Sequence, residues 1–263
     1  HLHDKIEFEV ATTCTDFSFI KNYSAVLKKA LGEKGFDIYF KELHSLTLSL
    51  IEGSCSTKFE KEKVSINKIT TYKEKIDSLE KSNRPDEILN IFLDTLYLCR
   101  SIGTYTFSIL ARHGFIAESL LRSIEDSQFI SSSRLNSFRQ SIQGVTTELI
   151  KDFNDVLIEN NSYENFIQKY GHLRPSTYDI CSPTYAEREK LFTSVSKSTN
   201  EPKNSKKFKF KSDEINFINK LLENFCNSSI SSNQLIFYIS ESIKLREKSK
   251  FEFTKLLSYA LTL

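Results

Sequence analysis

Residues that interrupt helices are scarce in this sequence of 263 residues, which holds 7 glycines and 4 prolines. Between them, apolar residues recur at intervals of three and four, which places them on one face of an α-helix. From position 17 to 51 this spacing predicts two amphipathic helices separated by GEKGFD. With 39% hydrophobic residues the chain can bury a proper core. The sequence therefore predicts a mainly α, multi-helix fold.

Composition and local pattern divide the chain further. Near the N-terminus Ile6, Phe8 and Val10 alternate with glutamates, which predicts a short strand. Residues 1–195 are expected to form a helical region, 196–214 an exposed polar loop rich in lysine, and 215–263 C-terminal helices that pack on the same domain. Gly103 and Gly114 interrupt the most apolar part of the chain and predict breaks between buried helices.

Several classes of protein are disfavoured by composition. Lys+Arg 36 nearly balance Asp+Glu 34, so no overall basic field attracts nucleic acid. The five scattered cysteines form neither a disulfide framework nor a zinc motif, and no apolar run reaches the length of a membrane span. No glycine-rich phosphate loop, Gly-x-Ser-x-Gly elbow or His-Glu-x-x-His pair is present. We therefore expect a cytoplasmic protein that binds no metal within this chain.

The sequence KYGHLRPSTYDICSPTY, residues 169–185, is unusually rich in polar and conformationally special residues. Gly171 permits a turn, and Pro175 forces Arg174 out of helical geometry. His172 can exchange a proton near neutral pH, Arg174 can bind a carboxylate or phosphate through two hydrogen bonds, and Asp179 can accept from a donor. Either a binding site on a rigid segment or a buried polar turn whose groups satisfy one another fits this pattern.

Two other stretches have both a functional and a structural interpretation. A helix broken at Gly103, with Arg100 and Arg112 on either side, would expose amide donors to an anion, whereas a tight helix crossing at glycine is the simpler explanation. Near the C-terminus, basic residues follow one another along a predicted helix, and for most of them a solvated face is favoured. These residues are Lys244, Arg246, Lys248, Lys250 and Lys255.

Segments spread over nearly the whole chain resemble, in the same order, the central region of phosphoenolpyruvate-synthase-like (PEP-utilising) phosphotransferases. More narrowly they are similar to the smaller bacterial branch found with surface-polysaccharide genes, which includes L-glutamine kinases. The segments are DKIEFEVATTCTDFSF, CRSIGTYTFSILARHGFIAESLLRSI, FRQSIQGVTTELIKDF, FIQKYGHLRPSTYDICSPTYAE and REKSKFEFTKLLSYAL.

The resemblance implies a three-part kinase. An ATP-grasp domain binds ATP and Mg²⁺, a mobile domain carries the phosphoryl group on a histidine, and the helical middle region binds the acceptor. This chain resembles the middle region alone, since neither the nucleotide-binding pattern nor the carrier-histidine motif is present. ATP and Mg²⁺ would then bind to flanking domains. The acceptor would be the amide of L-glutamine, in capsule or surface-polysaccharide biosynthesis, or alternatively pyruvate.

The resemblance also implies roles for individual residues. His172 and Arg174 would orient the acceptor and the phosphoryl oxygens, and Tyr178 and Asp179 would hydrogen-bond the acceptor. The remaining contributors would be Arg112 with Gly103 and Thr104.

Two further classes remain open. A non-catalytic helical scaffold would use the turn at His172 as a structural latch between flanking catalytic domains. A stand-alone interaction module would use the lysine-rich loop around Phe208 and Phe210. We rank the module lowest because the charge is nearly neutral and the resemblance is collinear.

Overall fold

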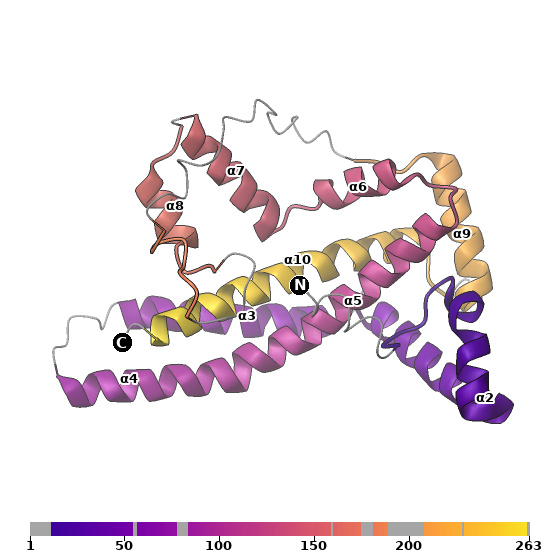
Figure 1. Ribbon diagram of the computed structural model, residues 1–263, viewed down its shortest axis with the longest axis horizontal. Coiled ribbons are helices and arrows are strands. Elements are labelled where there is room, and N and C mark those ends of the chain that lie inside the picture. Colours follow the sequence, from indigo (N-terminus) through magenta and orange to yellow (C-terminus); the bar gives the residue numbers. More distant parts are fainter. Residues whose placement is uncertain are drawn as a thin grey trace. The chain divides into compact units, whose positions relative to one another are not determined.

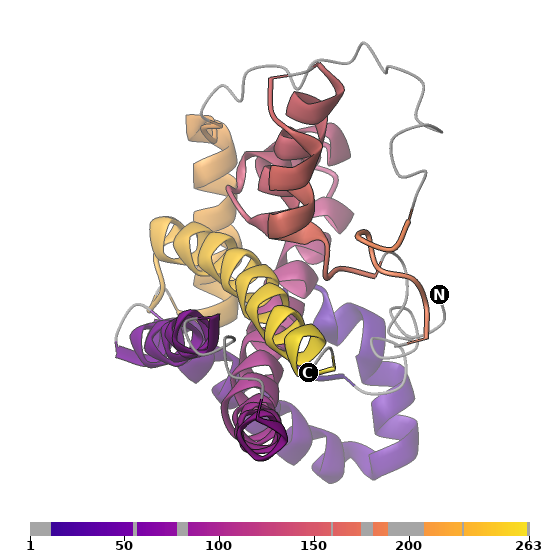
Figure 2. The same cartoon turned by 90° about the vertical axis from the view of Figure 1, so that its left-hand side faces the viewer.

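The protein is mainly α-helical over the residues that the computed structural model describes, which are 12–54, 57–77, 84–158, 160–174, 181–188, 208–227 and 229–261 (Figures 1 and 2). The predicted fold class is confirmed. The strand expected at Ile6–Val10 lies outside the described residues. No helix in these ranges is both long enough and apolar enough to cross a membrane.

The helices up to α8 follow one another closely in the sequence, and residues 171–211 separate α8 from α9. In chain order they are α2 (Phe19–Ser54), α3 (Thr57–Asp77), α4 (Pro85–Leu98), the π-helical segment η1 (Cys99–Thr104), α5 (Tyr105–Asp126), α6 (Ser132–Ser141), α7 (Val145–Leu157), α8 (Tyr163–Tyr170), α9 (Ser212–Cys226) and α10 (Ser232–Ala260). Helix α9 begins inside the range predicted as loop, and residues 196–207 of that range lie outside the description.

Helix α2 contains the kink that the sequence predicts. Gly32 has φ 72 and ψ 168, so the helical path stops there and resumes within GEKGFD. Glycine adopts such a positive φ at little cost, whereas other residues are strained there. Two successive helices in this range are therefore confirmed. Asp16 caps the first of them, because its Oδ1 accepts a hydrogen bond from the amide of Ser18 at 2.9 Å.

The breaks expected at Gly103 and Gly114 are wrong. Figure 1 shows α4, η1 and α5 as one continuous ribbon, and the residues that flank η1 have right-handed helical dihedral angles. Glycine inside a helix costs only about 1 kcal/mol, which close packing can offset. A Cβ on Gly103 would lie 2.5 Å from Phe253, and one on Gly114 would lie 2.5 Å from Arg246. Both glycines therefore allow these side chains to pack closely against the helix, as in the tight helix crossing considered above for Gly103.

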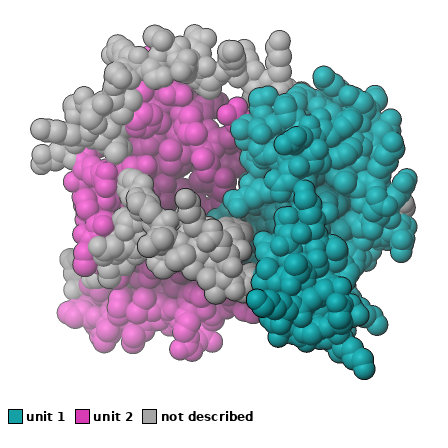
Figure 3. All heavy atoms as spheres, turned by 45° about the vertical axis from the view of Figure 1, so that its right-hand side comes forward, with its two compact units in different colours: residues 1–62, 109–139, 208–246 teal, residues 63–108, 140–207, 247–263 magenta. Residues whose placement is uncertain are grey.

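The chain divides into two compact units, each assembled from three separate segments (Figure 3). Unit 1 comprises residues 1–62, 109–139 and 208–246, and unit 2 comprises 63–108, 140–207 and 247–263. Each unit thus draws on residues both before and after the predicted loop.

Unit 1 buries the apolar face of its part of α5 together with residues of α9 and α10. Leu110, Ile116, Leu120 and Leu121 are at most 1% exposed. His113 belongs to this buried face, and its Nδ1 lies 3.2 Å from the hydroxyl of Tyr238. The imidazole of His113 and the hydroxyl of Tyr238 are therefore paired with each other, which reduces the cost of burying them.

Among its described residues, unit 2 has two clusters of buried side chains. Ile69, Cys99 and Leu256 form the first, with Phe253 packed against it. Phe166, Tyr170 and Phe251 form the second, with Tyr185 packed against it. Phe251 and Phe253 come from the same helix, α10, so this helix supports both clusters.

Candidate functional site

The turn that begins at Gly171 closes helix α8 and starts the candidate site. Ser162 caps the start of α8 by accepting a hydrogen bond from the amide of Asn165 at 3.2 Å. At the other end Gly171 has φ −56, an ordinary helical value. Glycine is required for space instead, because a Cβ would lie 2.4 Å from the carbonyl oxygen of Ile167. The expected role of Gly171 as a special backbone conformation is therefore wrong.

Backbone hydrogen bonds join the turn to residues 182–186, which lie beside it. The amide of Tyr185 donates to the carbonyl of Leu173 at 2.9 Å, and the amide of Ala186 donates to that of Gly171 at 3.0 Å. The Nε of Arg174 adds a bond to the carbonyl of Ser182 at 3.0 Å. Residues 171–174 are thus held against 182–186 at both ends.

His172 is half-buried and packs on helix α10. Its ring meets that of Phe251 edge to face, with centroids 4.8 Å apart. Phe251 also contacts Tyr170, with ring centroids 5.9 Å apart. The imidazole is therefore fixed by packing against an aromatic cluster. A ring held in this way can orient a ligand or can serve the core.

A charged network lies just before the turn. Lys169 Nζ and the Tyr170 hydroxyl both donate to Asp152 Oδ2 at 2.8 Å. Burial acts to raise the pKa of Asp152, but these two donors outweigh it and the pKa is lowered. Burial raises the pKa of Tyr170 to about 12. For Lys169, the interaction with Asp152 and Tyr170 outweighs burial and raises the pKa. The network ties α8 to α7.

A second carboxylate, that of Glu187, lies at the end of the segment that is hydrogen-bonded to the turn. Glu187 accepts a hydrogen bond from the amide of Thr184 at 2.7 Å, and its own amide donates to Thr184 Oγ1 at 3.3 Å. The pKa of Glu187 is lowered, first by the Thr184 amide and also by the charge of Arg174. Tyr178 and Asp179 lie in 175–180, outside the described residues.

Gly103 and Thr104 lie away from the turn within unit 2. Gly103 packs on Phe253, whereas His172 packs on Phe251. Two residues apart on a helix point about 200° apart, so the two groups contact different sides of α10. The Thr104 side chain donates to the carbonyl of Cys99 at 3.2 Å. Because η1 is continuous with α5, no helix N-terminus exists there to bind an anion.

Arg112 belongs to unit 1 and is exposed on α5. Its charge acts on the thiol of Cys14, although burial dominates there and raises the pKa of that thiol to about 11.

Among the basic residues expected on the C-terminal helix, Arg246 crosses Gly114 and places its guanidinium 5.2 Å from the ring centroid of Phe115. That arginine is packed against the protein.

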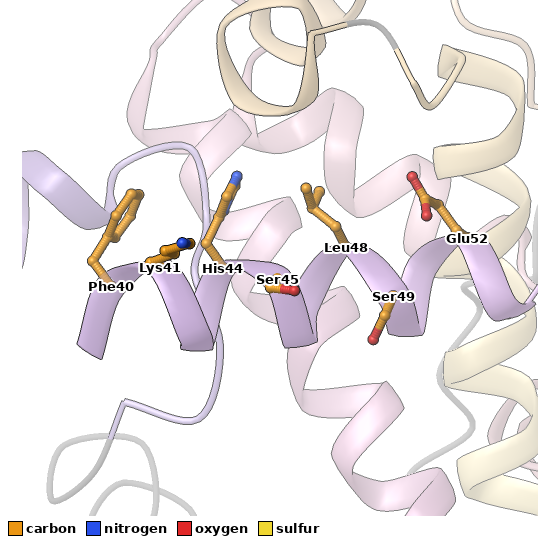
Figure 4. Close-up of a pocket in the computed structure, with 7 residues that line it drawn as sticks. All are labelled: Phe40, Lys41, His44, Ser45, Leu48, Ser49 and Glu52. Carbon is orange, nitrogen blue, oxygen red and sulfur yellow. The ribbon is translucent and has the colours of Figure 1, made fainter. Parts of the chain in front are cut away.

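Sequence reasoning missed a groove in unit 1 that lies along helix α2 and has a volume of about 460 Å³. Figure 4 shows Phe40, His44, Leu48 and Glu52 projecting from the same side of α2. Their spacing of four residues is the signal that could have revealed this face. The other lining residues are Lys41, Ser45 and Ser49.

His44 joins this groove to the rest of unit 1. Its Nδ1 lies 2.9 Å from the hydroxyl of Thr15, and its ring stacks on Phe40 and meets Phe225 edge to face. Burial lowers the pKa of His44, against a hydrogen bond with the backbone of Phe225. The imidazole therefore connects α2 to α9 through its contact with Phe225.

Comparison with known proteins returned no matching family model, no matching curated protein and no matching solved structure.

Proposed function

We propose that this chain forms the acceptor-binding helical region of an ATP-dependent phosphotransferase, in which a phosphoryl group passes from ATP to a carrier histidine and then to a small acceptor. ATP, Mg²⁺ and the carrier histidine would belong to flanking domains. The proposed acceptor is the amide of L-glutamine, in capsule or surface-polysaccharide biosynthesis, and the alternative is pyruvate. The sequence resemblance supports the class of reaction.

The observation that carries the proposal is the way Arg174 is held. Its backbone lies in a segment fastened at both ends, and among the described residues its guanidinium donates a single hydrogen bond, from Nε. The two Nη groups therefore remain for an anion within the part of the chain that the structure describes. A guanidinium recognises a carboxylate or a phosphoryl group with paired hydrogen bonds. L-Glutamine and pyruvate both carry a carboxylate.

Preorganisation is the physical advantage of such a site. Phosphoryl transfer depends on positioning and on charge stabilisation, and donors that are already fixed need not reorganise during the reaction. His172, held against Phe251, would orient the acceptor beside Arg174. Tyr178 and Asp179 complete the proposed set, with Asp179 binding the ammonium group of glutamine. Gly103 and Thr104 are left out, because Gly103 contacts a different side of α10 and the Thr104 hydroxyl is hydrogen-bonded within η1.

A non-catalytic scaffold is the second candidate. The packing of His172 on the Phe251 cluster and the backbone bonds of the turn favour it, because both would also stabilise a latch between domains. The observation that favoured a stand-alone interaction module, the loop around Phe208 and Phe210, no longer supports it. Phe208 and Phe210 pack on Phe138, with ring centroids 5.5 and 5.1 Å away, so these side chains belong to unit 1.

Calorimetric titration of the full natural chain with L-glutamine and with pyruvate tests the proposal. We expect one of the two to bind, and Arg174→Ala to weaken its binding at least about tenfold, which corresponds to about 1.4 kcal/mol. Arg174→Lys keeps the charge but loses the paired geometry, so it should bind with intermediate affinity. The control is Arg122→Ala, which removes an exposed arginine of unit 1.

The same titration separates the two candidates. Binding of neither compound would reject both acceptors and favour the scaffold. Circular dichroism of His172→Ala provides an independent criterion, since a scaffold latch predicts loss of helical signal, whereas an acceptor site predicts a folded protein with weakened binding.

A further inference from the structure

Helix α4 and the residues after it carry an exposed apolar stripe in unit 2. Leu89, Leu93 and Tyr97 are 55%, 52% and 66% exposed, and they follow one another at intervals of four residues. Residues four apart share one face of a helix. The opposite face of the same elements is buried, as shown by Thr95 and Cys99, so the stripe is a distinct outer surface.

The π-helical segment extends this stripe by one more aromatic residue. Tyr105, 64% exposed, follows Tyr97 by eight residues, which in a regular α-helix would turn it about 80° off the stripe. A π turn holds one residue more than an α turn. Because η1 contains this wider turn, the eight residues from Tyr97 to Tyr105 cover about the same rotation as seven residues of a regular α-helix. Tyr105 therefore lies within about 20° of Tyr97 around the helix axis. The stripe then runs about 24 Å, from Leu89 to Tyr105.

Opposite charges lie at equal sequence distances from Leu93, one in α4 and one in η1. Asp86 precedes Leu93 by seven residues, and Arg100 follows it by seven. Both lie at the stripe, since seven residues make almost two helical turns. Asp86 pairs with Arg84 at 3.0 Å, but these side chains are 66% and 69% exposed. Such a solvated pair contributes little and can exchange partners.

We propose that this face binds a second copy of the chain, with the two α4 helices antiparallel and a two-fold axis at Leu93. In that arrangement Leu93 meets the partner's Leu93, Leu89 meets the partner's Tyr97, and Asp86 meets the partner's Arg100. Each pair is related by the same symmetry, as a two-fold interface requires. A parallel arrangement would instead place Asp86 beside its own copy, so charge complementarity selects the antiparallel one.

Composition and size agree with a reversible dimer. Tyrosine and arginine are enriched in interface cores, whereas lysine is depleted there. One helix stripe buries less than the roughly 800 Å² per partner of a standard interface. We therefore expect association in the micromolar range and not a permanent assembly.

Sedimentation equilibrium of the purified protein over a series of concentrations tests the dimer. Leu93→Asp places two carboxylates at the two-fold axis, and we expect it to weaken dimerisation at least about a hundredfold. The matched control is Ile150→Asp, which alters an equally exposed side chain (51%) of α7 in the same unit and should leave dimerisation unchanged. Circular dichroism checks that both variants remain folded.

A charge exchange tests the antiparallel register itself. Asp86→Arg alone and Arg100→Asp alone each oppose like charges, and we expect each to weaken the dimer at least about tenfold. The double exchange restores opposite charges across the axis and should recover most of the affinity. The proposal is overturned if the protein stays monomeric throughout, if Leu93→Asp behaves as its control does, or if the double exchange recovers nothing.

Discussion

Two arginines, one in each unit, hold irregular segments in contrasting ways. In unit 1, Arg134 binds Glu214 through two hydrogen bonds of 2.9 and 3.0 Å, donates to the carbonyl of Lys209 and covers the ring of Phe208 at 4.2 Å. In unit 2, Arg174 donates one hydrogen bond among the described residues, to a backbone carbonyl. A guanidinium paired with a buried carboxylate fastens a structure, whereas one that has no carboxylate partner within hydrogen-bonding distance among the described residues can also bind a ligand. Arg134 therefore serves stability, and under the proposed function Arg174 would serve recognition.

The largest effect that this comparison predicts is on stability at Arg134. Arg134→Ala would leave Glu214, only 5% exposed, without its cation, so we expect the free energy of unfolding to fall by about 2–3 kcal/mol. Urea denaturation followed by circular dichroism measures this loss. The control Arg122→Ala should change it by less than about 0.5 kcal/mol. A loss no larger than that of the control would remove the structural role of Arg134.

Gly171 gives the next largest effect, and it concerns the turn of unit 2. Gly171→Ala forces a Cβ to within 2.4 Å of the Ile167 carbonyl oxygen and 3.2 Å of Ala186 Cβ. We expect a loss of about 2 kcal/mol from this overpacking, measured in the same denaturation experiment. Adding Ala186→Gly relieves only the second contact, so it should recover little. Full recovery in the double variant would show that the backbone contact is not the cause.

Arg174→Ala should destabilise the protein less than either change. It removes one hydrogen bond to a backbone carbonyl, which corresponds to about 1 kcal/mol. If recognition is its main role, this small loss accompanies the large loss of acceptor binding described above. Thermal denaturation and calorimetry on the same preparation measure both. A stability loss as large as that of Arg134→Ala would mean that both arginines mainly stabilise the fold, which would contradict the contrast between them.

The smallest predicted effect is a pH dependence. The hydrogen bond from Arg134 is the main cause that lowers the pKa of Glu214 below its ordinary 4.5. The stability that this carboxylate contributes is therefore complete above about pH 4.5 and is lost as the pH falls through its lower folded pKa. Urea denaturation from about pH 7 to 3 should show a smaller acid loss in Arg134→Ala than in the wild type. Equal losses in both proteins would contradict the assignment.

The sequence predicts helices better than it predicts where they break. Intervals of three and four between apolar residues identify the mainly α fold, and GEKGFD marks the kink at Gly32. At Gly103 and Gly114, by contrast, glycine does not break the helix but allows close packing, because Phe253 and Arg246 occupy the space that a side chain would need. Those partners lie more than 130 residues away in the chain, so the local pattern contains no sign of them.

The candidate site was predicted in part. Polar residues around Gly171 indicate an irregular segment, but its fastening depends on Phe251 and on Ser182, which the local pattern does not select. His44 and His113 were missed for a related reason. Each looks like an isolated histidine in an amphipathic helix, and only folding brings Thr15 and Tyr238 to them.

The segment η1 has a consequence for how this protein can change over generations. A π turn is an α turn that has accommodated one inserted residue, and the chain hides that insertion inside a helix instead of expelling it into a loop. Deleting a single residue from Cys99–Thr104 would restore a regular helix and leave everything beyond it at nearly the same rotation relative to α4, because the π turn already rotates eight residues like about seven. Leu110 and Ile116 would then stay in the core, so this short segment tolerates the loss of one residue, which would turn the rest of a regular helix by about 100°.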